Sequence, residues 1–231
     1  MADKDIGVLL FGDDRYPTNL GGLASSSPVM FYWGNLGLLT APSLGMCGSR
    51  KASDLGLKAA AACGEEVQQQ GVVVVSGYAK GVDTETHLAA LRNGGSTIIV
   101  LAEGFDHFRI KRSIPREIFK KEKVLVLSQF APRQPWSAGG AMTRNKLIYG
   151  LSLALVVVEA GEKGGTLAAG SGALAQGKPV FVLDFNGSTP AGNRILLEKG
   201  GVPVPTRTHL GKAIQGLLSH PDAARKQLSL L

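Results

Sequence analysis

The sequence predicts an α/β protein with a doubly wound, mostly parallel sheet of about six or more strands and helices on both faces. From Ser43 onward, short apolar runs alternate with stretches of helical periodicity, the order that parallel strands joined by crossover helices require. The runs Val72–Val75 and Leu155–Val158 show no polar alternation, which is typical of strands buried on both faces. Glycine accounts for 31 of 231 residues. The usual share is about 7%, so the excess indicates tight turns and backbone held close to a ligand.

The strands follow one another along the chain at regular intervals. Pro28–Trp33 forms a short strand ahead of the alternating part, and Gly34-Asn35 turns the chain out of it. The core strands are expected at Leu44–Cys47, Val72–Val75, Thr97–Leu101, Val124–Leu127, Ala154–Val158 and Val180–Leu183.

Helices are predicted between these strands. Ser53 and Asp54 cap a helix that runs to about Gln70, where Gly71 ends it. Three further helices are expected from Asp83 to about Asn93, from Thr143 or Arg144 to Gly150, and from Thr166 to Gln176. Two more are expected to start at Ser113 and Pro115 and at Gly192-Asn193. We expect one domain, with a lead-in over residues 1–42, a core over 43–205 and a small C-terminal helix over 206–231.

The composition restricts the class of protein. With 44% apolar and 19% charged residues, the chain is neither disordered nor a coiled coil. Its longest apolar runs fall far short of the roughly 20 residues that cross a membrane. Cys47 and Cys63 cannot build a disulfide framework and no charged-then-apolar leader opens the chain, so we expect a cytoplasmic protein. The histidines and cysteines lack metal-ligand spacing, so neither a metal nor a cofactor is expected.

Basic residues are concentrated in the middle of the chain. Residues 105–146 hold ten Lys and Arg against three Asp and Glu, so the other 15 basic and 15 acidic residues cancel and the net charge of +7 lies in this window. Such a concentration is typical of a surface that binds phosphates. A solvated helix face explains residues 116–123 equally well when they are taken alone.

Two early strand-to-helix turns carry candidate binding residues. In Gly48-Ser49-Arg50-Lys51, the glycine admits an anion to backbone N–H groups and the arginine can bind a phosphate with two hydrogen bonds. The second turn contains Ser76, Gly77 and Lys80, followed by Asp83 and His87 on one helix face. These last two residues could form an acid/base pair. The simpler interpretation, which we prefer, is that Asp83 caps the helix and His87 forms local hydrogen bonds.

Two later turns complete the set. Arg144-Asn145-Lys146 would place two cations at the positive end of a helix, and Trp136 in the preceding loop could either stack on a base or pack as a satellite of the core. Gly164-Gly165-Thr166 separates a buried strand from a helix, where bare amides and the helix dipole favour an oxyanion. The carboxyl ends of parallel strands meet at one edge of the sheet, so we expect these turns to form one phosphate-binding site.

Taken together, these turns resemble the DprA/Smf DNA-processing family, whose core is an extended Rossmann-like domain. The resemblance runs in order through most of the chain. The matching segments are Asp14-Arg15-Tyr16-Pro17 and Tyr32-Trp33-Gly34-Asn35, then Gly48-Ser49-Arg50, Ser76–Gly95, Arg144-Asn145 with Gly150-Leu151-Ser152, Glu159-Ala160, Gly165-Thr166-Leu167 and Gly192-Asn193.

The resemblance implies a homodimer that binds single-stranded DNA, without enzymatic activity, and helps to load a RecA-type recombinase onto incoming DNA in natural transformation. It assigns phosphates to Arg50 and to the region of Arg144, and it places the Gly164–Thr166 turn in the lining of the pocket. Ala141-Met142 stands where the family usually has Phe-Pro, so an aromatic that stacks on bases is missing there. We expect a compact member without the family's flanking helical and winged-helix domains.

Two alternatives belong to other functional classes. Related folds bind nucleotides or nucleotide-derived ligands, and the phosphoribohydrolases among them cleave nucleoside monophosphates with a PGGxGTxxE turn. Ala169 stands where that reaction needs its glutamate, which disfavours the hydrolysis but leaves ligand binding open. A nicotinamide dehydrogenase does not fit, because the first turn lacks the three-glycine spacing and Ser76 stands where an acidic residue would close the second strand.

Overall fold

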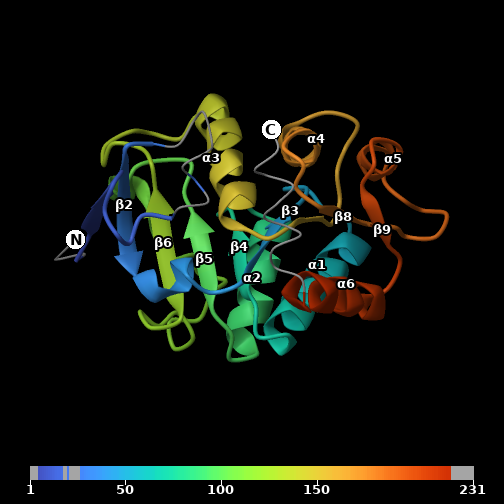
Figure 1. The fold of residues 1–231 in the computed structure, drawn as a ribbon, viewed down its shortest axis with the longest axis horizontal. Helices are drawn as coiled ribbons and strands as arrows, with labels where there is room; N and C mark the ends of the chain where they lie inside the picture. The colour runs from blue at the N-terminus through green and yellow to red at the C-terminus, as the bar shows by residue number, and fades with distance from the viewer. Residues whose placement is uncertain (1–4, 18–19, 21–26, 220–231) are drawn as a thin grey trace.

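The structure is a computed structural model that describes residues 5–17, 20 and 27–219. Within these residues, nine strands form one sheet in the order β1-β2-β6-β5-β4-β3-β7-β8-β9 (Figure 1). The antiparallel pairs are β1 (Gly7–Leu10) with β2 (Val29–Gly34) and β2 with β6 (Val124–Ser128). All remaining pairs are parallel, so the predicted doubly wound, mostly parallel sheet is confirmed.

The parallel part of the sheet alternates with helices along the chain. Its other strands are β3 (Ser43–Cys47), β4 (Val73–Ser76), β5 (Thr97–Val100), β7 (Leu155–Val157), β8 (Val180–Leu183) and β9 (Val202–Val204). The helices are α1 (Asp54–Gln69), α2 (Val82–Arg92), α3 (Ala138–Leu151), α4 (Gly165–Ala175), α5 (Ala191–Glu198) and α6 (Arg207–Ser219). The rest of the predicted C-terminal helix, residues 220–231, lies outside the described residues.

Helices cover the parallel strands on both faces. Helices α3, α4 and α5 lie over one face, and helices α1, α2 and α6 lie over the other (Figure 1). In β4, Val73 and Val75 point to the first face while Val74 points to the second. Because both faces are apolar, the strand needs no polar residue, and this explains the uninterrupted valine run.

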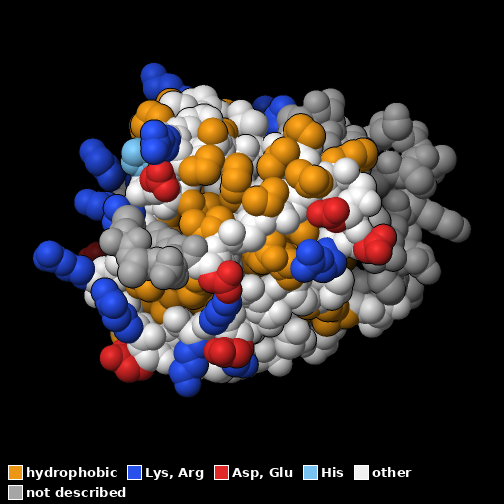
Figure 2. Space-filling view, turned by 90° about the vertical axis from the view of Figure 1, so that its left-hand side faces the viewer, with side chains coloured by type: hydrophobic (Ala, Val, Ile, Leu, Met, Phe, Trp, Pro, Cys, Tyr) orange, Lys and Arg blue, Asp and Glu red, His pale blue; other side chains and the backbone are white. Residues whose placement is uncertain are grey.

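Among the described residues, no α-helix lies between β1 and β2 in the chain, and one face of this pair remains partly open. Figure 2 shows hydrophobic side chains gathered on the side of the molecule that carries β1 and β2; Val8, Leu10 and Phe11 are exposed. The N–H of Leu10 donates to the Asp13 carboxylate at 2.8 Å, and the Leu10 carbonyl accepts from the N–H of Asp13. This turn gives hydrogen-bond partners to part of the unpaired backbone edge of β1. Such protection of an edge strand is common, because an open edge can pair with another chain.

Two predicted helices differ from the structure. The helix expected from Ser113 and Pro115 is absent: residues 111–123 form successive turns that bury Ile114 and Phe119. These two anchors are five residues apart and would point to different sides of a helix. The helix expected from Thr143 or Arg144 begins earlier, at Ala138, because the Ser137 side chain accepts a hydrogen bond from the N–H of Gly140 and caps it.

The chain topology determines where a ligand can bind. From β3 the chain continues through α1 to β4 on one side, whereas β7 lies on the other side of β3. The connections that follow β3 and β7 therefore leave the sheet in opposite directions, and their divergence opens a crevice at the carboxyl ends of these strands. Among the described residues, none of the helices combines the length and apolar character that a membrane crossing requires.

The fully buried Asn193 connects the carboxyl ends of β7 and β8 to α5. Its Oδ1 accepts from the N–H of Ala160 at 2.7 Å, and its Nδ2 donates to the carbonyls of Val158 at 2.9 Å and Leu183 at 2.8 Å. One side-chain amide thus satisfies three backbone groups, and this fixes the strand ends that border the crevice.

Replacing Asn193 by alanine is expected to lower the free energy of unfolding by roughly 3 kcal/mol, because three buried backbone groups lose their partner. Asn93→Ala is the control, since Asn93 is exposed and bonds one helix-end carbonyl, that of Ala89; its loss is expected to stay below about 1 kcal/mol. Urea unfolding followed by circular dichroism measures both. An equal loss of unfolding free energy in the two variants would show that the three hydrogen bonds of Asn193 stabilise the fold no more than the single bond of Asn93.

Candidate nucleic-acid interface

A groove of about 510 Å³ lies at the carboxyl edge of the sheet, at the divergence next to β3. All four predicted turns contribute to its lining, through Gly48–Lys51, Asp83, Arg144-Asn145 and Gly165-Thr166. Trp136 also lines it. The structure therefore brings together residues that are separated by more than half of the chain.

Six of the predicted site residues do not line the groove. Ser76 is buried and donates its hydroxyl to the carbonyl of Met46, and Gly77 lies beneath Arg144. Lys80 and Lys146 are exposed outside the groove, His87 is fully buried, and Gly164 caps α4 with a φ of +113°. The buried members of this set support the groove from below.

The basic window, residues 105–146, contributes less to the groove than expected. Of its ten cations only Arg144 lines the groove. Lys121 pairs with Asp5, Lys123 donates to the carbonyl of Gly94 near the opposite edge of the sheet, and Lys111 donates internally to the β4–α2 turn. The other cations at the groove are Arg50, Lys51 and Lys163, all outside the window. Residues 105–146 are therefore not the main source of positive charge in the groove, contrary to the expectation of a phosphate-binding surface there, because Lys120, Lys121 and Lys123 directly precede β6 and Lys111 is bonded to the β4–α2 turn.

An internal carboxylate occupies the N-terminus of α1 near the groove. At α1, Glu159 accepts from the Ser53 N–H at 3.1 Å and from the Ser53 hydroxyl at 2.7 Å. At α2 the N-cap is Gly81 and no side chain caps the helix; Asp83 accepts from the Ala79 N–H of the preceding loop at 3.2 Å. The N-terminus of α4 has no side-chain cap, since Gly164 stands there. The first residues of α4, Gly165 and Thr166, line the groove, so their backbone N–H groups are available to an anion.

Arg144 forms the floor of the groove. It is the seventh residue of α3 and not at a helix end, contrary to the sequence prediction. Its buried guanidinium donates through Nη1 to the carbonyl of Val100 at 2.9 Å and lies 3.9 Å from the Asp83 carboxylate. Nε is buried without a partner among the described residues. Burial lowers the pKa of Arg144 below its usual value, and the charge of Asp83 opposes this effect.

The position of Arg144 depends on the absence of a side chain at Gly77. A Cβ built at Gly77 would lie 1.6 Å from Arg144 Nη1 and 2.4 Å from Asp83 Oδ2. Real atoms do not approach this closely, so any larger residue must displace the guanidinium or the strand end.

His87 is a structural residue and not a partner of Asp83 in acid/base chemistry. Its Nε2 donates to the carbonyl of Gly77 at 2.6 Å, and Nδ1 lies 2.6 Å from the Thr97 hydroxyl. Burial lowers the pKa of His87 to about 4, so the imidazole is neutral at pH 7. The hydrogen bonds of His87 agree with the simpler interpretation of the sequence, but the prediction that Asp83 caps the helix is wrong, because the helix begins at Val82 with Gly81 as its N-cap.

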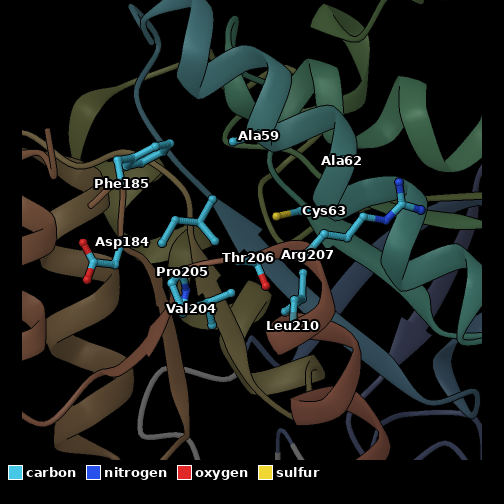
Figure 3. Close-up of a pocket in the computed structure, with 11 residues that line it drawn as sticks. Ala59, Ala62, Cys63, Asp184, Phe185, Val204, Pro205, Thr206, Arg207 and Leu210 are labelled. Atoms are coloured by element: carbon cyan, nitrogen blue, oxygen red, sulfur yellow. The ribbon is translucent and has the colours of Figure 1, made fainter. Parts of the chain in front are cut away.

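A second, smaller cavity of about 100 Å³ lies between α1, α6 and the ends of β8 and β9 (Figure 3). Its lining is mostly apolar, and burial raises the pKa of the Cys63 thiol there to about 12. The Arg207 guanidinium donates to Glu65 at 2.9 Å and to Glu66 at 2.8 Å. Its charge is already paired, so this cavity does not suit a phosphate. No cluster of three or more His, Cys, Asp or Glu that could hold a metal occurs in the described part of the chain.

Gly77→Ala is expected to destabilise the fold by roughly 1–3 kcal/mol, since the added methyl group overlaps Arg144. Gly216→Ala on α6 provides the matched control, because its Cβ would meet nothing within 4 Å. That helix-interior change is expected to stabilise by roughly 0.5–1 kcal/mol. Thermal and urea unfolding measure both effects, and the same sign for the two variants would contradict the packing argument.

The stability of the protein is expected to fall as the pH decreases from about 6.5 to about 4, in part because of His87. In this interval the unfolded imidazole binds a proton and the folded one does not, so unfolding becomes easier. His87→Gln should remove roughly 2–3 kcal/mol of the difference between unfolding at pH 7.5 and at pH 4.5. The exposed His209→Gln variant should keep the wild-type difference. An unchanged pH dependence in His87→Gln would show that His87 is protonated in the folded chain.

Comparison with known proteins identifies the family. A family model described as DNA recombination-mediator protein A matches residues 7–214. The DNA processing protein DprA of Streptococcus pneumoniae is 36% identical over 171 residues, which cover 74% of this chain and 60% of that protein. The chain therefore spans less than two thirds of the length of that relative.

Solved structures agree with this comparison. The X-ray structure of DprA from Streptococcus pneumoniae has a TM-score of 0.80 at 31% identity and covers 90% of this chain and 74% of that one. DprA from Helicobacter pylori, described for its single-stranded DNA binding mode, has a TM-score of 0.79 at 24% identity and covers 93% and 96%. The family match, the curated relative and the shared fold confirm the resemblance seen in the turns, and the chain belongs to the DprA/Smf family of recombination-mediator proteins.

Proposed function

We propose that the groove binds single-stranded DNA and that the protein acts in DNA processing for recombination. The observation that carries this proposal is the convergence of the ends of β3, β4 and β7 with α3 around one groove that has three cations at its rim, a fourth at its floor and an uncapped helix N-terminus. This combination suits a chain of phosphates. The family description and the single-stranded DNA binding of the Helicobacter pylori protein also support it.

Two parts of the groove suit phosphate groups. The N–H groups of Gly165 and Thr166, with the helix dipole and the nearby Lys163, form one anion site. Arg50 and Lys51 form the other, and their exposed side chains can reach a strand that lies across the groove. Arg144 adds positive charge from the floor without leaving its buried position.

Trp136 supplies an aromatic surface for a base. It is 48% exposed and lines the same groove as Ala141 and Met142, the residues that stand where the family usually has Phe-Pro. Base stacking on aromatic rings is tolerant of sequence, as a protein that handles incoming DNA requires. The recombinase partner, the homodimer, the lack of catalysis and the cytoplasmic location remain predictions from the sequence and its resemblance.

A nucleotide or nucleotide-derived ligand is the second candidate. The groove volume of about 510 Å³ lies within the range of small-molecule sites, about 300–1,000 Å³, and this observation favours it. Ala169 is buried in the second turn of α4, so the described groove offers no carboxylate there for phosphoribohydrolase chemistry. Binding without hydrolysis would be the function in that case.

The dependence of binding on salt distinguishes the two candidates. If three phosphates are neutralised, the affinity for a fluorescein-labelled oligothymidylate should fall roughly 20-fold between about 50 and about 200 mM salt. Thymidine monophosphate should bind weakly in the same assay. Tight monophosphate binding together with a flat salt response of the oligonucleotide would favour the second candidate.

Arg50→Ala is expected to weaken binding of the oligothymidylate by roughly 1.5–3 kcal/mol, because a charge-assisted bond to phosphate is lost. Arg92→Ala is the matched control, since Arg92 is exposed at the end of α2 away from the groove. Fluorescence anisotropy at one fixed salt concentration compares the two variants. Equal losses would mean that only the net charge matters, and an unchanged affinity in Arg50→Ala would remove this residue from the site.

A further inference from the structure

Arg50 and Trp136 contact each other in the groove. The guanidinium carbon of Arg50 lies 5.1 Å from the centroid of the Trp136 ring, within the range of a cation–π interaction. Arg50 belongs to the turn between β3 and α1, whereas Trp136 belongs to the loop before α3, and both line the groove. The contact therefore joins two segments that border the proposed DNA site.

The contact is one that a ligand can replace. Both side chains are exposed, and cation–π pairs are weak at exposed sites. Within the described residues Arg50 has no carboxylate partner, so no ion pair holds it on the ring. The face of Trp136 that Arg50 covers is also a face on which a base could stack.

The backbone holds the Trp136 loop in place while its side chain stays exposed. The Gly104 N–H donates to the carbonyl of Gln134 at 2.8 Å, and the Asp106 N–H donates to the carbonyl of Pro132 at 3.0 Å. These bonds attach the loop to the segment after β5. The backbone of the loop is thus positioned before any ligand arrives, which reduces the entropy that binding must overcome.

We infer that Trp136 and Arg50 together select an unpaired strand; this inference rests on the proposed function. An unpaired base replaces the guanidinium on the Trp136 ring, and the released guanidinium binds a neighbouring phosphate. One exposed cation–π contact is thereby exchanged for base stacking and a charge-assisted hydrogen bond. A base pair inside a duplex is stacked on both sides and cannot offer its face, so Arg50 stays on the ring.

The emission of Trp136 reports this exchange directly. The chain has two tryptophans, and Trp33→Phe leaves Trp136 as the single reporter. In this background, oligothymidylate should change the emission of Trp136 over the same concentrations that raise the anisotropy of the labelled oligonucleotide. A duplex hairpin of equal charge should leave the emission unchanged. Arg50→Ala without DNA should also change the emission, because the cation leaves the ring.

Variants of Trp136 test the selectivity. Trp136→Leu should reduce the preference for single-stranded over duplex DNA by about tenfold, through weaker single-strand binding with unchanged duplex binding. Trp136→Phe should retain part of the preference, since it keeps an aromatic face. Circular dichroism confirms that each variant is folded.

The outcomes separate this inference from the proposed function. Oligothymidylate that binds by anisotropy with no change in Trp136 emission, or a Trp136→Leu variant that keeps the full preference, overturns the exchange and leaves single-strand binding intact. A wild-type protein that does not bind oligothymidylate by anisotropy overturns the proposed function itself.

Discussion

The groove depends on the burial of one guanidinium, that of Arg144. This side chain comes from α3, donates to the end of β5 and lies against Gly77 at the end of β4 and Asp83 in the first turn of α2. Burying a charge is costly unless other groups compensate for it. The compensation here requires a carboxylate at 83 and no side chain at 77, so three of the predicted site residues act as one unit. The Nε of Arg144 is buried without a partner among the described residues.

The electrostatics of the groove follow from which charges remain unpaired and not from the net charge of the chain. Glu159 accepts the backbone N–H of Ser53 at the N-terminus of α1, and this helix end no longer attracts an outside anion. The uncapped end of α4 does. Most cations of residues 105–146 lie outside the groove, where they contribute only through a field that salt screens beyond roughly 10 Å.

The sequence predicts those parts of the structure that depend on local chemistry. The uninterrupted valine strand was predictable because two covered faces leave no place for a polar residue, and the turns were predictable because parallel strands end at one edge. The start of α3 was not, since Gly139 and Gly140 lower the helix propensity that marks a first turn. The hydrogen bonds of Glu159 to Ser53, which are 106 residues apart, follow from tertiary packing and leave no local signal.

The size of the groove limits what one chain can do with DNA. Four cations and one helix end can neutralise only a few phosphates, and each phosphate contact releases roughly 0.7 counterion from a single strand. If the groove binds DNA as we propose, its affinity for a short strand is therefore expected to be modest and to decrease at physiological salt. A second groove that engages the same strand would bind intramolecularly, at an effective concentration set by the length of DNA between the grooves. The predicted homodimer would supply that second groove. Tight binding at physiological salt would therefore require the same assembly that the resemblance predicts.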